Sequence, residues 1–102
     1  MRIPRWLRNQ KVTVKPFKGQ GAYGPVYGTE FVEWVRFEPS TRKIRDSKGE
    51  EVVTSGRGWF APESPVKEGD LILWEGKEFE VILAIPQYGK YAKSHVEVSC
   101  KL

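Results

Sequence analysis

The chain has 102 residues, of which 39% are hydrophobic, 13% aromatic and 29% charged, and its formal net charge is +4. This length and composition fit one small domain over residues 1–102 and exclude a disordered or fibrous chain. No apolar run approaches the ~20 residues that cross a bilayer, and no hydrophobic region follows the N-terminal arginines as it does in a signal peptide. The single cysteine, Cys100, excludes an internal disulfide and fits a reducing compartment.

The positive charge is concentrated near the N-terminus. Six of the 17 basic residues and none of the 13 acidic residues lie within residues 1–29. A basic arm over residues 1–10 favours an acidic partner, either nucleic acid or an acidic protein surface; the alternative is a solvated terminus that aids solubility. Pro4 and the shortness of the segment argue against a helix, and we expect Trp6 and Leu7 to anchor the arm to a surface.

The first predicted strand covers residues 11–15, where Val12 and Val14 alternate with polar residues, and it ends at Pro16. Four glycines and a proline over residues 19–28 then predict a long flexible loop. It does not fit a phosphate-binding loop, because no Gly-Lys-Ser/Thr follows and no helix begins behind it. We expect Tyr23 and Tyr27 either to pack against a neighbouring subunit or to fasten the loop to its own domain.

The second predicted strand covers residues 31–38 and is apolar on both faces. Phe31, Val35 and Phe37 share one face, and Val32 and Trp34 share the other. This pattern indicates that the outer side of the strand is covered, either by the N-terminal arm or by another subunit.

A charged excursion follows. The strand is expected to stop at Glu38-Pro39-Ser40, and between Thr41 and Glu51 only Ile44 is hydrophobic. The segment turns at residues 47–49 and returns through residues 51–54. It is too polar to fill a core, so it is predicted to be a projecting hairpin that contacts something outside the domain.

Four further strands are predicted, over residues 58–61, over residues 71–74, in a long run that ends at Pro86, and over residues 95–102. A tyrosine-containing loop is expected over residues 87–94. In the long run Phe79, Val81, Leu83 and Ile85 share one face at a period of two. In the last strand the inward positions are Val96, Val98, Cys100 and Leu102. No segment after the N-terminus has helical periodicity, which predicts an all-β fold: a small antiparallel barrel or sandwich of about six strands with a projecting charged hairpin.

No catalytic, metal or cofactor site is expected. His95 lies on the polar face of the last strand, and Cys100 alternates with apolar residues as a buried, inert thiol does. Zinc needs three or four ligands, and the chain offers one cysteine and one histidine. Glu50 and Glu51 are adjacent, so on a strand they point to opposite faces. The sequence therefore argues against an enzyme.

Nucleic-acid binding stays open as an alternative function. Small β-barrels bind single strands through basic grooves that carry aromatic platforms, and the four tryptophans and the basic arm are compatible with this. An extended positive groove is weakened because the strands that would present it mix glutamates with lysines; these glutamates are Glu33, Glu38, Glu78 and Glu80.

The string VRFEPSTRKIRDSKGEEVV, residues 35–53, resembles the minor capsid and head-completion proteins of tailed bacteriophages. In these short β-rich proteins a strand ending in a similar Glu-Pro-Ser precedes a charged segment of the RDSxGEEVV type. Other matching pieces occur in the family's order over roughly residues 10–101: V-T-V-x-P at 12–16, YGPVYG at 23–28, KEGDxI at 67–72, GKEFEV at 76–81 and H-x-E-V at 95–98.

The resemblance implies a structural, non-enzymatic part of the head-to-tail connector, located in the virion neck and made in the host cytoplasm. Related stopper proteins form a ring in which a hairpin projects toward the axis, closes the channel after DNA packaging and moves aside for ejection. Carried over by position, the channel-facing residues are Arg42, Lys43, Arg45, Asp46, Lys48, Gly49 and Glu50. Contacts within the ring or to partners are expected from Arg2, Arg5, Trp6, Arg8, Tyr23, Tyr27 and Trp34.

The implied partners are further copies of the chain in a ring of roughly 12 or 6 subunits, the portal or adaptor ring, tail completion or tail tube proteins, and packaged double-stranded DNA bound non-specifically, with no membrane partner. In such a ring many copies of the hairpin's basic residues would surround DNA. Asp46, Glu50 and Glu51 are expected to form ion pairs with arginine and lysine side chains of neighbouring copies. The alternative is a solvent-exposed hairpin whose charges pair within one chain.

Overall fold

A computed structural model describes residues 10–88 and 93–102. Within these ranges every regular element is a β-strand, and no helix long and apolar enough to cross a membrane is found. The strands are β1 (Gln10–Lys15), β2 (Phe17–Gly21), β3 (Gly24–Tyr27), β4 (Phe31–Arg45), β5 (Glu51–Phe60), β6 (Leu71–Trp74), β7 (Lys77–Tyr88) and β8 (Lys93–Lys101).

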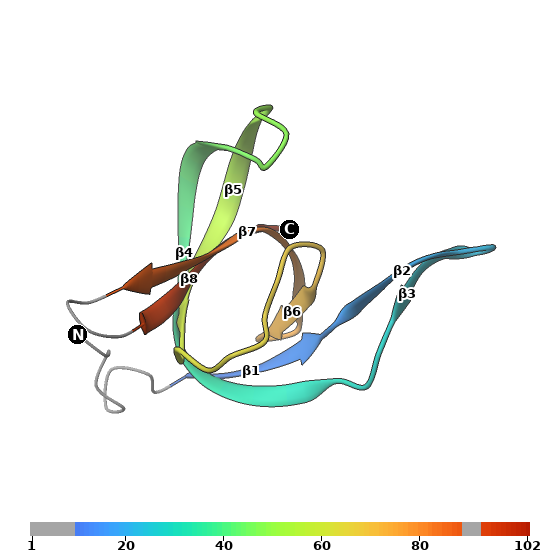
Figure 1. Ribbon diagram of the computed structural model, residues 1–102, viewed down its shortest axis with the longest axis horizontal. Coiled ribbons are helices and arrows are strands. Elements are labelled where there is room, and N and C mark those ends of the chain that lie inside the picture. The colour runs from blue at the N-terminus through green and yellow to red at the C-terminus, as the bar shows by residue number, and fades with distance from the viewer. Residues whose placement is uncertain (1–9, 89–92) are drawn as a thin grey trace.

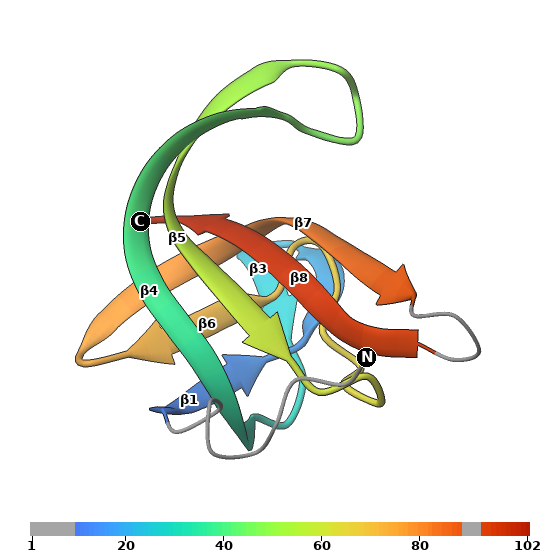
Figure 2. The same cartoon turned by 90° about the vertical axis from the view of Figure 1, so that its left-hand side faces the viewer.

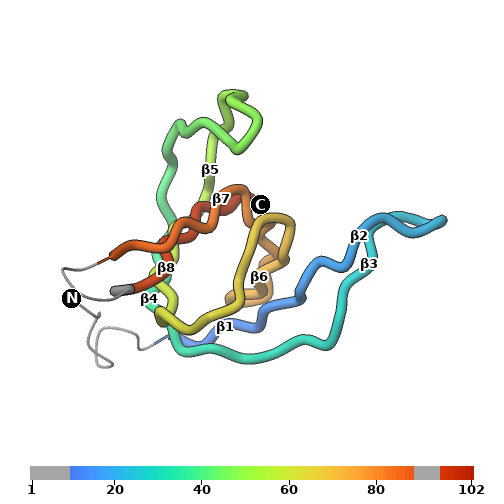
Figure 3. The backbone as a smooth tube through the Cα atoms, in the orientation of Figure 1, coloured from blue at the N-terminus to red at the C-terminus, as the bar shows by residue number. Residues whose placement is uncertain are grey.

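Six strands form a closed antiparallel barrel in the order β1-β4-β5-β8-β7-β6 (Figure 1). Strand β1 closes it, because Val14 lies opposite Phe31 of β4 on one side and opposite Ile72 of β6 on the other. The backbone trace in Figure 3 follows this circuit, with β2 and β3 extending away from it as a separate hairpin. The prediction of an all-β fold is confirmed, and the architecture is a barrel.

The core lies inside the barrel and is built from the alternating positions of its strands. Val12 and Val14 of β1, Val35 and Phe37 of β4, and the buried valines of β8 all face inward, because successive side chains of a strand point to opposite faces. Phe37 sits at the centre, with ring centroids 5.1 Å from Phe79 and 4.9 Å from Trp74.

Two glycines of β5 make room for these rings. A Cβ atom at Gly56 would lie 2.8 Å from the ring of Phe37, and one at Gly58 would lie 2.9 Å from the ring of Phe60. The absence of side chains at these two positions therefore sets how closely β5 can approach the aromatic core.

Strand β7 departs from the prediction. Its register shifts between Val81 and Leu83, and the extra residue of such a bulge changes which side chains face inward. Ala84 packs against the core, whereas Ile85 is 47% exposed. The strand also runs through Pro86 to Tyr88, so the prediction that Pro86 ends it is wrong; β7 pairs only with β8 there, and proline is tolerated on an edge.

Val96, Val98 and Cys100 of β8 are buried as predicted. The prediction that Leu102 also faces inward is wrong, because Leu102 follows the end of β8 and is mostly exposed. The expected loop over residues 87–94 is likewise replaced at its two ends by β7 and β8, while residues 89–92 lie outside the described ranges.

The glycine-rich segment is a two-stranded hairpin formed by β2 and β3, and we refer to residues 17–27 as the glycine arm. The prediction of a flexible loop over residues 19–28 is wrong. Gly19 and Gly24 have φ angles of 127° and 121°, a region that glycine enters at little cost. They allow the irregular register and the tight end of a hairpin whose sequence lacks the usual strand alternation.

Asp70 fixes the root of the glycine arm to the barrel. Its carboxylate is 1% exposed and accepts hydrogen bonds from the Phe17 backbone N–H at 2.8 Å and the Lys67 backbone N–H at 3.0 Å. The Lys67 Nζ atom donates to Asp70 Oδ1 at 3.1 Å and to the Phe17 carbonyl at 3.0 Å. Across the arm, the Gly28 N–H donates to the Pro16 carbonyl at 2.7 Å. The direction in which the arm leaves the barrel is thus held by several bonds.

We expect Asp70→Ala to lower the free energy of unfolding by about 3 kcal/mol, because it leaves two backbone N–H groups and a lysine without their shared acceptor. Urea unfolding measures this loss. Asp46→Ala is the matched control, since that aspartate also accepts backbone bonds but does so at an exposed turn. Equal effects of the two substitutions would contradict the anchoring role of Asp70.

Candidate functional site

The charged hairpin, residues 40–54, is the part of β4 and β5 that extends beyond the barrel wall (Figures 1 and 2). Strand β4 pairs with β1 only up to Val35, and β5 pairs with β8 only from Gly56 onward. Beyond these points the two strands have only each other as sheet partners. Strand β4 passes through Pro39 with a register shift before Arg42, so the prediction that it stops at Glu38-Pro39-Ser40 is wrong, whereas the projection itself is present.

Asp46 organises the tip of the charged hairpin. Its Oδ1 atom accepts hydrogen bonds from the backbone N–H groups of Lys48 and Glu50, each at 2.9 Å. Arg45 closes the turn from the other side, donating from Nη1 to the Gly49 carbonyl at 2.8 Å. Gly49 has a φ of 82°, which favours glycine. The turn predicted at residues 47–49 is confirmed. It is held by the side chains of Arg45 and Asp46, which the resemblance had assigned to the channel.

Part of the charge on the hairpin is paired within the chain. Lys43 Nζ lies 3.3 Å from a carboxylate oxygen of Glu51, with both side chains more than half exposed. Since Asp46 caps its own turn, two of the three acids expected to contact neighbouring copies already have intrachain partners. Exposed pairs of this kind are worth little, roughly 0–1 kcal/mol, so the Lys43–Glu51 pair can exchange for another partner at small cost.

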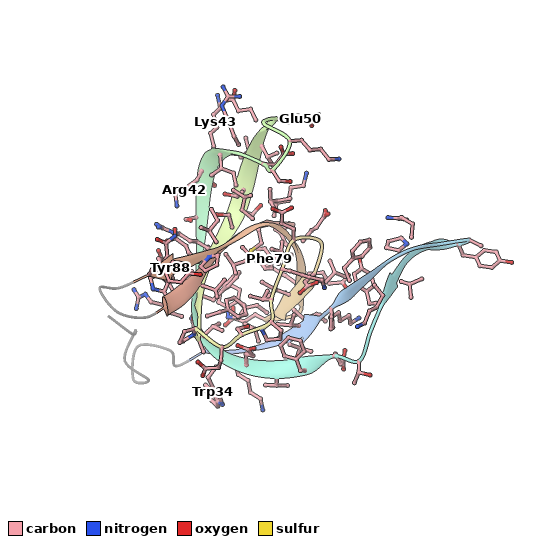
Figure 4. All side chains as sticks on the ribbon, in the orientation of Figure 1. Trp34, Arg42, Lys43, Glu50, Phe79 and Tyr88 are labelled. Atoms are coloured by element: carbon pink, nitrogen blue, oxygen red, sulfur yellow. The ribbon has the colours of Figure 1, made fainter. Side chains whose placement is uncertain are left out.

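The remaining charged side chains extend outward. Within the described ranges Arg42, Lys48 and Glu50 form no ion pair. Figure 4 shows Arg42, Lys43 and Glu50 reaching out from the hairpin. Each copy therefore offers two unpaired basic groups and one unpaired acid to whatever lies beyond the hairpin.

The other residues predicted to make contacts are scattered over the surface. Tyr23 lies between β2 and β3 at the end of the glycine arm, with a relative exposure of 105%. Tyr27 lies near its root, opposite Phe17, and the centroids of these two rings are 5.9 Å apart in an edge-on arrangement that joins the two strands of the arm. Trp34 of β4 is 57% exposed. Arg2, Arg5, Trp6 and Arg8 lie outside the described residues.

Sequence reasoning missed a row of side chains across the outer wall of the barrel. Arg36 of β4, Trp59 of β5, Glu97 of β8 and Ile85 of β7 lie directly opposite one another across four strands. Two guanidinium carbons lie over the ring of Trp59, that of Arg57 at 4.8 Å and that of Arg36 at 5.9 Å. Alternation predicts that Trp59 faces outward between Gly58 and Phe60, but only the strand pairing brings the row together.

The positive charges of this wall are balanced by carboxylates. Arg57 donates from Nε to Glu97 Oε1 at 2.8 Å and also from Nη2 to the same oxygen. Arg36 Nη2 lies 3.6 Å from Glu38 Oε2. The outer wall is thus an aromatic surface with neutralised charge, which does not resemble the basic groove that single-stranded nucleic acid requires.

Burial shifts the pKa values of both residues that could act as a nucleophile or a base, Cys100 and His95. Burial raises the pKa of the Cys100 thiol to about 12, so the thiol stays protonated near neutral pH. Burial lowers the pKa of His95, and the nearby Glu97 carboxylate opposes that shift. Among the described residues no three His, Cys, Asp or Glu side chains form a group that could hold a metal ion.

Comparison with known proteins gives a fold relationship. No protein-family model matches the chain, and no curated protein matches it in sequence. Among solved structures, the XkdH protein of the phage-like element PBSX of Bacillus subtilis is similar, with a TM-score of 0.56 and 16% sequence identity over 90% of this chain and 91% of that one. At this level of identity the likeness shows that the two chains share a fold.

The burial of Cys100 predicts its reactivity. In the folded protein at about pH 8 the thiol should fail to react with a maleimide or an aromatic disulfide, because the thiolate form is suppressed and the sulfur is enclosed. In denaturant it should react at once. Ser47→Cys, at the exposed turn, is the control that labels in the native state. Rapid labelling of native Cys100 would contradict the described packing of β8.

The charged hairpin should be separable from folding. Replacing residues 42–50 by a short glycine-serine linker is expected to change the free energy of unfolding by less than ~1 kcal/mol, because none of these residues enters the core. Urea denaturation of the two chains gives the comparison. A loss as large as that expected for Asp70→Ala would mean that the hairpin is part of the folding unit.

Proposed function

We propose that this protein is a non-enzymatic subunit of the connector ring that joins head and tail in a tailed bacteriophage. In this proposal the charged hairpin faces the DNA channel and helps to close it after packaging. The observation that carries the proposal is a two-stranded projection whose residues 42–50 take no part in the core and which carries charges without ion-pair partners at Arg42, Lys48 and Glu50 in the described part of the chain. The sequence resemblance to head-completion proteins and the fold shared with a protein of a phage-like element support the same assignment.

Repetition around a ring would give the hairpin its effect. One hairpin carries four basic and three acidic residues between Thr41 and Glu51, which is a weak charge by itself. Around an axis, identical hairpins would form a collar of closely spaced charges, and double-stranded DNA carries about one negative charge per 1.7 Å of its length. Contacts from arginine and lysine to phosphates carry no sequence information, which suits a channel through which any DNA sequence must pass.

The acids would keep such a collar from repelling itself when the channel is empty. Glu50 lacks an ion-pair partner in the described part of its own chain, and the Lys43–Glu51 pair is exposed and weak. An ion pair between Glu50 of one copy and Arg42 or Lys48 of the next copy would link neighbouring hairpins around the channel. Contact with DNA would compete with these pairs, so one set of side chains serves both the closed and the open arrangement.

In this role the protein would have defined partners and a defined location. The ring would contact further copies of itself, the portal or adaptor ring on one side, tail completion or tail tube proteins on the other, and packaged DNA in between. The protein would reside in the virion neck after assembly in the host cytoplasm. Its basic N-terminal arm would dock on the ring above or on DNA.

The test is removal of residues 42–50, with the linker described above, from the gene in the phage that encodes this protein. We expect heads that package DNA and then lose it, or that fail to join tails; nuclease protection of packaged DNA and electron microscopy of particles measure the two defects. The double substitution Arg42→Ala with Lys48→Ala should give a weaker form of the same defect. Lys77→Ala with Lys11→Ala, which removes two exposed lysines of the barrel, is the matched control. Normal infectious particles from the truncated gene would sink the proposed role.

The alternative function, a nucleic-acid-binding barrel that uses the basic arm, makes a different prediction for the purified chain. It requires tight binding of single-stranded DNA that weakens steeply with salt and persists without residues 42–50. Fluorescence anisotropy of the truncated chain across salt concentrations separates the two functions. Persistence of such binding would favour the alternative over the connector.

A further inference from the structure

The glycine arm ends in an uncharged, exposed surface that serves no purpose within its own chain. Residues 19–27 contain no charged side chain, although 29% of the whole chain is charged. At the end of the arm Tyr23 is fully exposed, and Val26 is 49% exposed. A two-stranded hairpin standing alone in water is marginally stable, yet the bonds around Asp70 hold this one in a fixed direction. An arm whose direction is fixed at its root and whose tip is exposed is suited to dock on a partner.

A matching surface lies on the outer wall of the barrel. We define the acceptor face as the row Arg36, Trp59, Glu97 and Ile85, together with Trp34 on the same face of β4. Trp34 and Ile85 are 57% and 47% exposed, and the two arginines that flank Trp59 are each paired with a glutamate. The face is therefore rich in aromatic side chains and has little net charge. Figure 2 shows the wall that carries it, with β4, β5 and β8 toward the viewer and the end of β7 beside β8.

The arm and the acceptor face point in different directions. In Figure 1 the arm extends to the right of the barrel, whereas the wall made of β4, β5 and β8 is on the left. Figure 4 labels Tyr88 on the left of the barrel and Trp34 below it, whereas the arm extends to the right. A contact between the arm of one copy and the wall of another would therefore be head-to-tail, and such a contact leaves one arm and one face free for further copies until a ring closes.

We propose that the tip of the glycine arm, Ala22 to Val26, docks on the acceptor face of the next copy, and that this contact builds the ring. The proposal rests on the proposed function and adds the interface that holds the ring together. A second copy is the occupant that fits, because the uncharged tip of the arm has no group that attracts DNA phosphates, whereas tyrosine and tryptophan in neutral surroundings are typical of the energetic centres of protein interfaces. The charged hairpin leaves the barrel in a third direction (Figure 1) and stays free of this contact.

Site-directed cross-linking tests the interface. A chain carrying Ala22→Cys and Ile85→Cys, which keeps Tyr23 in place, is treated with a short bismaleimide at a chain concentration on the order of 1 mM, which detects even weak association. Cys100 is buried with a raised pKa and stays unmodified. We expect a ladder of covalent dimers, trimers and higher species. Each single variant should stay monomeric, because a head-to-tail contact never brings two copies of one position together. A chain with Ala22→Cys and Val53→Cys, which uses an exposed apolar residue of the charged hairpin, should give no ladder.

Removal of the Trp59 side chain, which lies at the centre of the acceptor face, provides the second measurement. Trp59→Ala in the double-cysteine background should lower the yield of the ladder about 10-fold, because truncating an aromatic residue at the centre of an interface typically has an effect of this size. Val53→Ala in the same background should leave the yield unchanged, and urea unfolding checks that each variant is folded.

The outcomes separate this proposal from the proposed function. Absence of a ladder at the highest concentration, or cross-linked dimers from the single variants, would overturn the docking of the arm, even if imaging shows the chain in a neck ring. A ladder that depends on Trp59 supports the docking, even if truncation of the charged hairpin leaves the phage infectious and so removes the proposed role in the channel.

Discussion

Closure of the barrel is the constraint on which the rest of the structure depends. Because β1 pairs with both β4 and β6, six strands satisfy one another and enclose one aromatic core around Phe37. Closure removes the open edges that would invite uncontrolled association. It also fixes where the chain can do something else, since the two segments that extend beyond the circuit, the glycine arm and the charged hairpin, cannot be absorbed into it. The small barrel is thus a rigid base that carries two projections of opposite chemical character.

Each projection is held by polar bonds at a defined place. The buried carboxylate of Asp70 ties the start of β2 to the turn before β6, which sets the direction of the arm. In the charged hairpin Asp46 fixes the turn, while the pair between Lys43 and Glu51 remains exposed. The arm is therefore positioned at its root and neutral at its tip, whereas the hairpin is ordered at its tip and retains charges that can change partners. This difference is what a ring needs if one projection is to join subunits and the other is to respond to DNA.

The sequence predicts the core well and the surface relationships poorly, and the reason is physical. Alternation at Val12 and Val14, and again from Val96 to Cys100, reports which side of a strand is buried, because that property is local. Residues 81–85 (VILAI) are all apolar, so the sequence does not show which of them face inward, and nothing local reveals that Ile85 turns outward after the bulge. The glycine arm was missed because its pairing depends on turn geometry and on the anchor provided by Asp70. The charged hairpin could be found from composition alone, whereas the alignment of Arg36, Trp59, Glu97 and Ile85 requires the register of four strands.

The central claim is that the charged hairpin acts through repetition around an axis, and electron microscopy of the neck of native particles tests it most directly. We expect a ring of this chain between the head and the tail, with residues 40–54 of every copy directed toward the channel. A neck that lacks this chain, or a ring in which these residues point away from the channel, would contradict it.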